Sequence, residues 1–198
     1  PFRRLTMTDA IKEKTGMPVI GLIKRNYEGF ESYITPTMQE IDELVAADSD
    51  VIALDCTDMK RGDGTTIPEF LAAIRAKYPD LVIQCCASGG GRVNYGLMPY
   101  FDEFWVSDNT DAQQRLFIQW GTSMFFPACA MAQHVSASPN HQTRRVIPLK
   151  FRFDVAMTGR LGMEMKPSDL TEKELAYAKN AVATYKEIRP IIQQGNQY

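Results

Sequence analysis

Short apolar runs alternate with amphipathic segments along the whole chain. The runs lack polar–apolar alternation, which indicates strands buried on both faces. The amphipathic segments carry apolar residues at helical spacing, as in the segment 67–78. Strands are expected at 18–23, 50–55, 81–86, 104–106, 124–130 and 161–165. Helices are expected at 38–47, 67–78, 93–100, 112–120, 146–157 and 170–193, the last opening with a capping-box pattern at 171–174.

Buried strands that are each followed by a helix predict repeated βαβ units and a parallel sheet. The predicted fold class is therefore α/β with six strands, as a doubly wound open sheet or a parallel (β/α) barrel-like sheet. An open sheet would favour a dinucleotide fingerprint after the first strand. None is present, because Gly21 lies inside that strand. We expect residues 1–198 to form a single domain.

Composition and charge narrow the class of partner. The 198 residues are 44% hydrophobic and 23% charged, which is typical of a globular domain with a real core. The 22 basic and 24 acidic residues show no basic stripe, so a nucleic-acid partner is not expected. No apolar run approaches the roughly 20 residues of a membrane span, and residues 1–4 precede no apolar stretch. Neither a membrane partner nor a signal peptide is therefore expected.

The four cysteines follow neither a zinc pattern nor a disulfide framework. Cys85 and Cys86 are adjacent, whereas Cys56 and Cys129 stand alone. This usage predicts reduced thiols in a cytoplasmic protein.

In both candidate architectures, chemistry gathers beyond the carboxyl ends of the strands. Lys24, Asp55 and Asp108 stand at or just after predicted strand ends. A carboxylic acid in the position of Asp108 can serve as a general acid. Asp111 fits a helix N-cap instead.

The segment 86–92 follows a predicted strand and contains three consecutive glycines. Glycines allow close approach of the backbone to a ligand, so this segment is either a flexible turn or a cradle for polar groups. In the second interpretation, Ser88 and backbone N–H groups face the ligand. The glycine run alone leaves both interpretations open.

Both histidines, His134 and His141, fall in an expected loop at 133–143. No carboxylate or thiolate accompanies them at the spacing of a metal site. Hydrogen bonding within the loop is therefore expected, and neither a metal nor another cofactor is predicted.

From about residue 82 to its end, the chain resembles the C-terminal half of the catalytic barrel of a family 36 glycoside hydrolase, an α-galactosidase. The resemblance rests on CASGGGR at 86–92, WVSDNTDA at 105–112, HVS at 134–136, PNHQT at 139–143, FDVAM at 153–157, LGME at 161–164 and KEIR at 186–189.

From about residue 8 to residue 81, the chain is instead similar to N-acetylmannosamine-6-phosphate 2-epimerase. The matching stretches are PVIGLIKR at 18–25, YITPT at 33–37, ELVAA at 43–47, DVIALD at 50–55 and EFLAAIR at 69–75.

Both families are eight-unit (β/α) barrels, so the two resemblances imply a recombined barrel with an epimerase-like segment at 1–81 and an α-galactosidase-like segment at 82–198. The first resembles units three and four, and the second resembles units five to eight. A laboratory or combinatorial chimera would explain this combination, as would a natural fusion or a truncated gene. Because exposed sheet edges favour association, we expect either a barrel with fewer strands or a homo-oligomer that completes it.

The α-galactosidase resemblance implies a galactoside or other sugar ligand and gives Asp108 the role of acid/base. The segment that would border the sugar includes Cys86, Ser88, Gly89, Gly90 and Arg92. The family's nucleophile lies in a Lys-Trp-Asp motif that this chain lacks. Asp55 ends the corresponding strand and is the residue that could take its place.

The epimerase resemblance assigns the catalytic lysine to Lys24, without the family's partner glutamate or phosphate-binding loop. Three hypotheses follow: a weak or vestigial α-galactosidase, a folded chimeric scaffold without catalysis, and residual sugar-phosphate epimerase chemistry.

Overall fold

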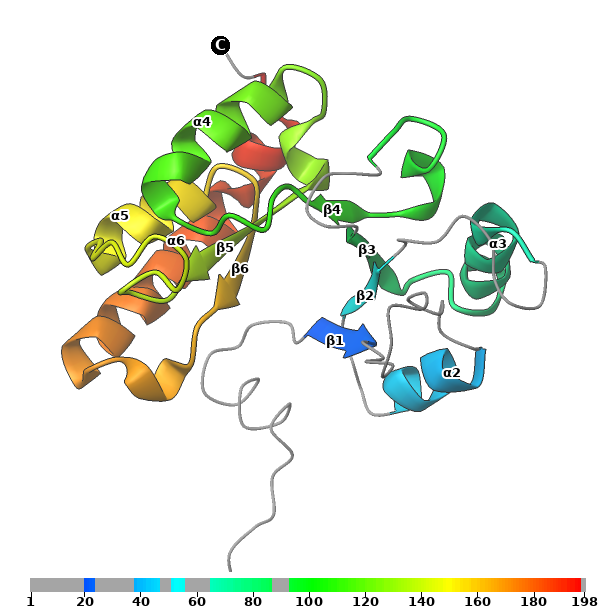
Figure 1. The fold of residues 1–198 in the computed structure, drawn as a ribbon, viewed down its shortest axis with the longest axis horizontal. Helices are drawn as coiled ribbons and strands as arrows, with labels where there is room; N and C mark the ends of the chain where they lie inside the picture. The colour runs from blue at the N-terminus through cyan, green and yellow to red at the C-terminus, as the bar shows by residue number, and fades with distance from the viewer. Residues whose placement is uncertain (1–19, 24–37, 47–50, 56–64, 87–92, 197–198) are drawn as a thin grey trace, which may run out of the picture. The chain divides into compact units, whose positions relative to one another are not determined.

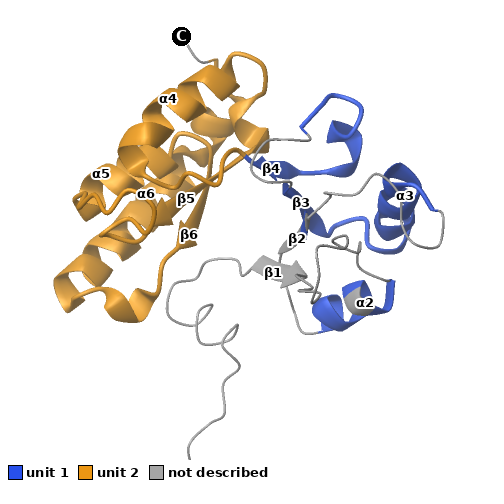
Figure 2. Cartoon of the chain, in the orientation of Figure 1, with its two compact units in different colours: residues 1–105 blue, residues 106–198 orange. Residues whose placement is uncertain are grey.

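The computed structural model of the chain describes residues 20–23, 38–46, 51–55, 65–86 and 93–196. For residues 20–23, 40, 51–53 and 55 it describes the backbone alone. The chain divides into two compact units, Pro1–Trp105 (unit 1) and Val106–Tyr198 (unit 2), coloured blue and orange in Figure 2. Each unit is a layer of parallel strands with helices packed on it.

Unit 1 contains parallel strands that neighbour one another in chain order (Figure 1). The register pairs Val51 with Val82 and Asp55 with Cys86, so neighbouring strands end at the same edge. The predicted α/β class with parallel strands is therefore confirmed, while closure into a barrel stays a prediction. The strands are β1 (Ile20–Ile23), β2 (Val51–Asp55), β3 (Val82–Cys86) and β4 (Glu103–Trp105).

The helices of unit 1 are α2 (Met38–Ala46) and α3 (Ile67–Lys77). Thr66 and Glu69 form a capping box that starts α3, because each satisfies the backbone N–H of the other. The helices pack on β2 and β3 through one apolar cluster. Its most deeply buried members are Ile41, Leu54, Leu71, Ile74 and Ile83.

Arg75 of α3 clamps the amino ends of β3 and β4. Its guanidinium donates to the carbonyl oxygens of Leu81 and Tyr100 and pairs with the carboxylate of Asp102. The same carboxylate accepts from the backbone N–H of Ile83 at 2.7 Å. One side chain thus joins α3 to the starts of two strands.

Unit 2 contains the parallel strands β5 (Met131–Ser136) and β6 (Arg160–Glu164), in a register that places His134 opposite Gly162. Its helices are α4 (Ala112–Ser123), α5 (Leu149–Ala156) and α6 (Glu172–Gln194). As predicted, α6 begins with a capping box at 171–174.

A buried polar layer joins α4 and the end of α5 to β5. The side-chain amide of Gln119 donates to the Gln133 amide oxygen at 3.0 Å and to the Val155 carbonyl oxygen at 2.9 Å. The hydroxyl of Thr158 donates to the same Gln133 oxygen at 2.7 Å. These bonds give partners inside the protein to the buried side-chain nitrogen of Gln119 and the buried side-chain oxygen of Gln133.

The strand predicted at 124–130 is wrong, because that segment forms a turn and a short 3-10 helix, η2 (Ala128–Ala130). The strand follows at 131–136, so His134 lies in β5 and not in a loop. This strand was missed because polar residues such as Gln133 interrupt the apolar run by which strands were identified. Pro127, which has no N–H to give a strand ladder, precedes η2 as its cap.

Two predicted helices are shorter than expected. The segment 93–100 forms turns and the 3-10 helix η1 (Met98–Tyr100). The helix expected from 146 begins at Leu149, because Pro148 takes an extended backbone conformation at its N-cap. In the described part of the chain, every helix is too short or too polar to cross a lipid bilayer.

Replacing Ile83 with alanine tests the core of unit 1. Ile83 is fully buried, so Ile83→Ala is expected to lower the free energy of unfolding by about 2–5 kcal/mol, as for other buried aliphatic truncations. Ile191→Ala is the matched control, since Ile191 is 71% exposed, and it should change the free energy by no more than about 0.5 kcal/mol. Urea unfolding followed by circular dichroism measures both. Equal losses in the two variants would contradict the packing described.

Candidate active site

The carboxyl ends of β2 and β3 bring two of the predicted site residues side by side. Asp55 is the last residue of β2, and the parallel register pairs it with Cys86, the last residue of β3. The Cys86 side chain is half-buried, and that of neighbouring Cys85 is buried. The remaining predicted residues on this side, Lys24, Ser88, Gly89, Gly90 and Arg92, lie outside the described residues.

Asp108 lies in unit 2, on the segment that leads into α4. Its side chain is exposed, whereas those of Thr110 and Asp111 are buried. Side chains of this segment fix its own turns: the Ser107 hydroxyl accepts from the backbone N–H of Asn109, and the Asn109 side chain accepts from that of Asp111, each at 3.1 Å. The Asp108 carboxylate is therefore exposed to solvent on a segment whose neighbouring residues are half-buried or buried and hydrogen-bonded.

Arg115 of α4 holds the backbone on both sides of Asp108. Its side chain donates to the carbonyl oxygens of Ser107 and Asn109, each at 2.6 Å. Burial lowers the pKa of Arg115 to about 10, against the opposing effect of the carboxylates of Glu164 and Asp108. The guanidinium therefore remains charged at neutral pH, and a fixed positive charge accompanies Asp108.

Glu164 is the second carboxyl in this part of unit 2. It ends β6 opposite Ser136, the last residue of β5. Although the Glu164 side chain is exposed, loss of hydration raises its pKa. His141 and Arg115 act in the opposite direction, and Asp108 raises this pKa further. Asp108 and Glu164 therefore interact electrostatically, with Arg115 as the shared cation.

His134 lies in β5 with its ring against Gly162. A Cβ atom at position 162 would be 2.3 Å from His134 Cδ2, so the ring occupies space that only glycine leaves open. Burial, assisted by the charge of Arg115, lowers the pKa of His134 to about 3. The imidazole is therefore neutral at physiological pH and can take part in hydrogen bonds without carrying charge.

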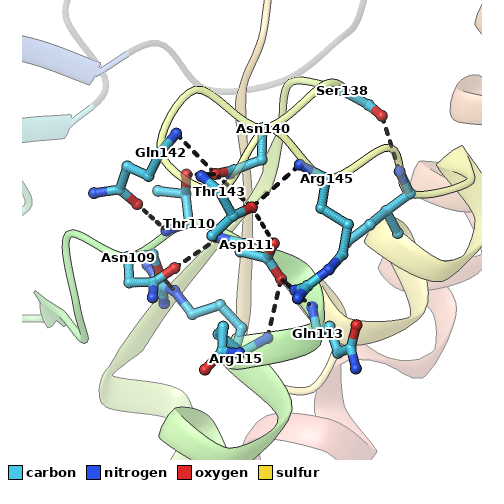
Figure 3. A network of polar contacts seen from close by, with 12 residues as sticks. Asn109, Thr110, Asp111, Gln113, Arg115, Ser138, Asn140, Gln142, Thr143 and Arg145 are labelled. Carbon is cyan, nitrogen blue, oxygen red and sulfur yellow. Dashed lines mark hydrogen bonds and ion pairs between the residues drawn. The ribbon is translucent and has the colours of Figure 1, made fainter.

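Asp111 is the centre of a buried polar network (Figure 3). Its carboxylate accepts from the backbone N–H groups of Gln113 and Gln114, at 2.9 and 3.1 Å, which confirms the predicted N-cap role. It also accepts from the Thr143 hydroxyl and pairs with the Arg145 guanidinium at 2.8 Å. The loop that follows β5 is thereby fixed to the first turn of α4.

Asn140 completes the attachment of that loop. Its side chain donates to the hydroxyl of Thr110 at 3.0 Å and accepts from the backbone N–H groups of Gln142 and Thr143. The Gln142 side chain in turn accepts from the backbone N–H of Thr110. Hydrogen bonding was expected in this loop, and His141 is carried on it. The segments after β4 and β5 are therefore parts of one hydrogen-bonded structure.

A buried arginine of α5 also holds the end of β5 and the loop after it. Arg152 of α5 donates to the carbonyl oxygens of Ser136 and Ile147, at 2.5 and 3.1 Å. Arg115 makes the same kind of contact from α4. In both cases a buried guanidinium on the following helix holds the backbone beyond a strand.

Two residues of this site, Arg115 and Glu164, were not identified from the sequence, and His134 was considered there only as a loop residue. Glu164 could have been found by applying the strand-end rule to the predicted strand 161–165, inside which it fell. Nothing in the sequence indicated that Arg115 is buried. Among the described residues, no group of three or more histidine, cysteine, aspartate or glutamate side chains could hold a metal ion.

Asp111 predicts a specific dependence of stability on pH. Burial alone would raise the pKa of Asp111, but the bonds from Thr143, Gln114 and Arg145 lower it below its usual range. A carboxyl whose pKa is lower in the folded chain stabilises fully above its unfolded value of about 3.9, and this stabilisation is lost as the pH falls through the folded value.

Asp111→Asn keeps a good N-cap but removes the charge. We expect it to lower the free energy of unfolding by about 1–2 kcal/mol at pH 7, with a smaller difference from the parent chain near pH 2.5. Urea unfolding at both pH values measures this. Asp154→Asn, which removes only an exposed ion pair with Lys150, is the control. A difference that stays constant with pH would contradict the charged network.

Gly162→Ala tests the position of His134. The added methyl group would overlap the ring, so we expect a loss of about 1–3 kcal/mol in the free energy of unfolding. At Gly121 a Cβ atom would meet nothing within 4 Å, and Gly121→Ala should stabilise α4 by up to about 1 kcal/mol. Thermal unfolding compares the two variants. If both gain stability, the ring does not lie against position 162.

Two family models match this chain. The Melibiase model matches residues 65–195, and the NanE model, which describes N-acetylmannosamine-6-phosphate epimerases, matches residues 4–95. Both resemblances stated from the sequence are thus confirmed. The two matches overlap at 65–95, a range that contains α3 and β3.

Curated proteins that are similar to this chain include α-galactosidases. Alpha-galactosidase AgaA of Geobacillus stearothermophilus is 46% identical over 125 residues, which are 63% of this chain and 17% of that protein. The bifunctional alpha-galactosidase/sucrose kinase AgaSK of Mediterraneibacter gnavus is 42% identical over 130 residues, 66% of this chain and 14% of that protein. The chain therefore spans less than a fifth of the length of these relatives.

Solved structures give the same result. The galactosidase domain of AgaSK matches with a TM-score of 0.70 and 36% identity, over 79% of this chain and 23% of that one. The α-galactosidase of Lactobacillus brevis matches with a TM-score of 0.68 and 35% identity, over 79% and 23%. Since the Melibiase model covers more than half of the residues, the chain belongs to the melibiase family.

Proposed function

We propose that this chain carries the acid/base part of an α-galactosidase-type site, of the kind used by retaining glycoside hydrolases, on a recombined (β/α) barrel-like scaffold. The observation that carries the proposal is the setting of Asp108. Its carboxylate is exposed on a segment that buried Arg115 holds on both sides by hydrogen bonds of 2.6 Å. A fixed backbone with an accessible carboxyl is what proton transfer to a bound substrate requires.

In the proposed reaction, Asp108 donates a proton to the oxygen of the glycosidic bond as the leaving group departs. It then takes a proton from the water that completes hydrolysis. A retaining enzyme also needs a carboxylate nucleophile, about 5–5.5 Å from the acid/base. Asp55 is our candidate for that role, because it ends β2 beside Cys86.

The proposed ligand is an α-galactoside. An AgaA variant has been crystallised with 1-deoxygalactonojirimycin, and a second variant with raffinose. We assign the binding of the sugar hydroxyls to Cys86 and to four residues of the glycine-rich segment after β3, which are Ser88, Gly89, Gly90 and Arg92.

Glu164 is a carboxyl of unit 2 that interacts electrostatically with Asp108, and loss of hydration raises the pKa of Glu164. Glu164 and the charged guanidinium of Arg115 are therefore two groups that interact electrostatically with Asp108. We propose that Glu164 and Arg115 set the electrostatic field in which Asp108 acts. Substitution of Glu164 should therefore change the pH dependence of hydrolysis more than the binding of sugar.

A folded scaffold without catalysis is the second candidate. The sequence lacks the Lys-Trp-Asp motif, since β2 lies in the region that matches the epimerase model. The lack of this motif favours a scaffold without catalysis. Loss of a nucleophile and its neighbours lowers rates by orders of magnitude. Epimerase chemistry at Lys24 and a homo-oligomer that completes the barrel remain predictions from the sequence.

Hydrolysis of an aryl α-galactoside tests the proposal. We expect slow turnover by the parent chain, and a fall in kcat/KM of about 10²-fold or more in Asp108→Asn. Asp55→Asn should abolish turnover if Asp55 is the nucleophile, and Glu164→Gln should shift the pH profile. Asp154→Asn, on the exposed side of α5, serves as the control and should have the activity of the parent chain.

Binding of 1-deoxygalactonojirimycin, measured by calorimetry, separates the two candidate functions. Binding without hydrolysis would favour the non-catalytic scaffold. Hydrolysis no faster than in buffer, or hydrolysis that Asp108→Asn leaves unchanged, would refute the catalytic proposal.

A further inference from the structure

Helix α4 exposes large apolar side chains, with Gln113 and Gln114 as the exposed polar residues of its first turns. These large side chains, together with those on the turn after the helix, are 44–71% exposed. We call this surface the α4 patch. It consists of Leu116, Phe117, Trp120, Met124 and Phe125.

The polarity of α4 is the reverse of that of an ordinary surface helix. Its buried face includes the polar side chains of Arg115 and Gln119, which bond the segment after β4 and the layer under α5. Its exposed face carries Phe117 and Trp120, whereas surface helices normally turn polar residues to water. The helix contains no charged residue besides Arg115, so no charge interrupts its exposed face.

Gly121 gives this face room for close contact. It lies within α4 next to Trp120, and a Cβ atom at this position would meet nothing within 4 Å. Glycine inside a helix is unfavourable compared with other residues. A small residue here permits another backbone or a large side chain to approach the helix closely.

The area of the patch is sufficient for a specific contact. Five side chains of roughly 200 Å² each, exposed to the fractions given above, present on the order of 600 Å². A patch of this size is at the upper end of what monomers expose, roughly 300–600 Å². Two such patches facing each other would bury on the order of 1,200 Å², the lower limit for stable protein–protein interfaces.

We infer that the α4 patch is the interface between two copies of this chain, packed α4 against α4 around a two-fold axis close to Gly121. A second copy fits this surface because an uncharged, apolar face complements itself and needs no oppositely charged partner. Two-fold pairing is also the commonest form of self-association. The inference goes beyond the proposed function and does not depend on it.

This interface differs from an oligomer that completes the sheet. It uses the outer surface of a helix in unit 2, whereas completion of a barrel would use unpaired strand edges. Substitutions on α4 therefore distinguish the two modes of association.

Sedimentation of the full chain from about 1 to about 100 µM tests the interface. We expect a monomer–dimer equilibrium, and at least a tenfold increase in the dissociation constant for Gly121→Arg. Because nothing lies within 4 Å of a Cβ atom at position 121, this variant should keep the circular dichroism of the parent chain. Ile191→Arg places the same charge on α6, at a residue 71% exposed, and should dimerise normally.

Tryptophan fluorescence gives a second measurement. The chain has two tryptophans, of which Trp105 is 8% exposed and Trp120 is 66% exposed. Dimerisation should shift the emission to shorter wavelength as concentration rises, and Trp120→Phe should abolish that shift. A chain that stays monomeric throughout, a Gly121→Arg dimer of unchanged affinity, or a dimer that forms without a change in Trp120 emission would each overturn the inference.

Discussion

The parallel pairing of β2 with β3 is the interaction on which the rest of unit 1 depends. It joins a strand from the epimerase-like region to a strand that lies in the overlap of the two family matches. Backbone hydrogen bonds make this pairing, and Leu54 and Ile83 bury the apolar surface beside it. Because the register ends both strands together, Asp55 and Cys86 share an edge, as a ligand site at strand ends requires.

Buried arginines connect the fold to the candidate site in unit 2. Arg115 of α4 and Arg152 of α5 each donate hydrogen bonds to carbonyl oxygens at or after the end of the preceding strand. An irregular segment next to a site cannot satisfy all its carbonyls through a regular ladder, and a guanidinium offers several donors in one plane. Burial lowers the pKa of Arg115, but the side chain stays charged at neutral pH. The same group therefore supports the backbone and contributes to the field around Asp108 and Glu164.

The pattern of apolar residues was sufficient to predict the strands that are buried through apolar side chains. Strands β2 and β3 lie within a residue of their expected ranges, because their runs are uniformly apolar or nearly so. Strand β5 was missed, since Gln133 and His134 are accommodated by Gln119 and Gly162, contacts that exist only after folding. Asp108 was found from its place after a predicted strand, and the resemblance to a known family gave it the role of acid/base. Arg115 and Glu164 were missed, because the burial of Arg115 and the charges around Glu164 arise only in the folded chain.

The clamp at Arg75 has a consequence for how such a chain can arise. Two of its three partners are backbone carbonyls, which every residue supplies whatever its side chain. Only Asp102 must be retained for the ion pair, and it lies downstream of α3. With the division expected at residue 81, Arg75 lies in the epimerase-like segment and Asp102 in the α-galactosidase-like segment, so the clamp crosses the division. A joint between two barrel fragments at this place therefore depends on one side-chain match and otherwise on backbone groups.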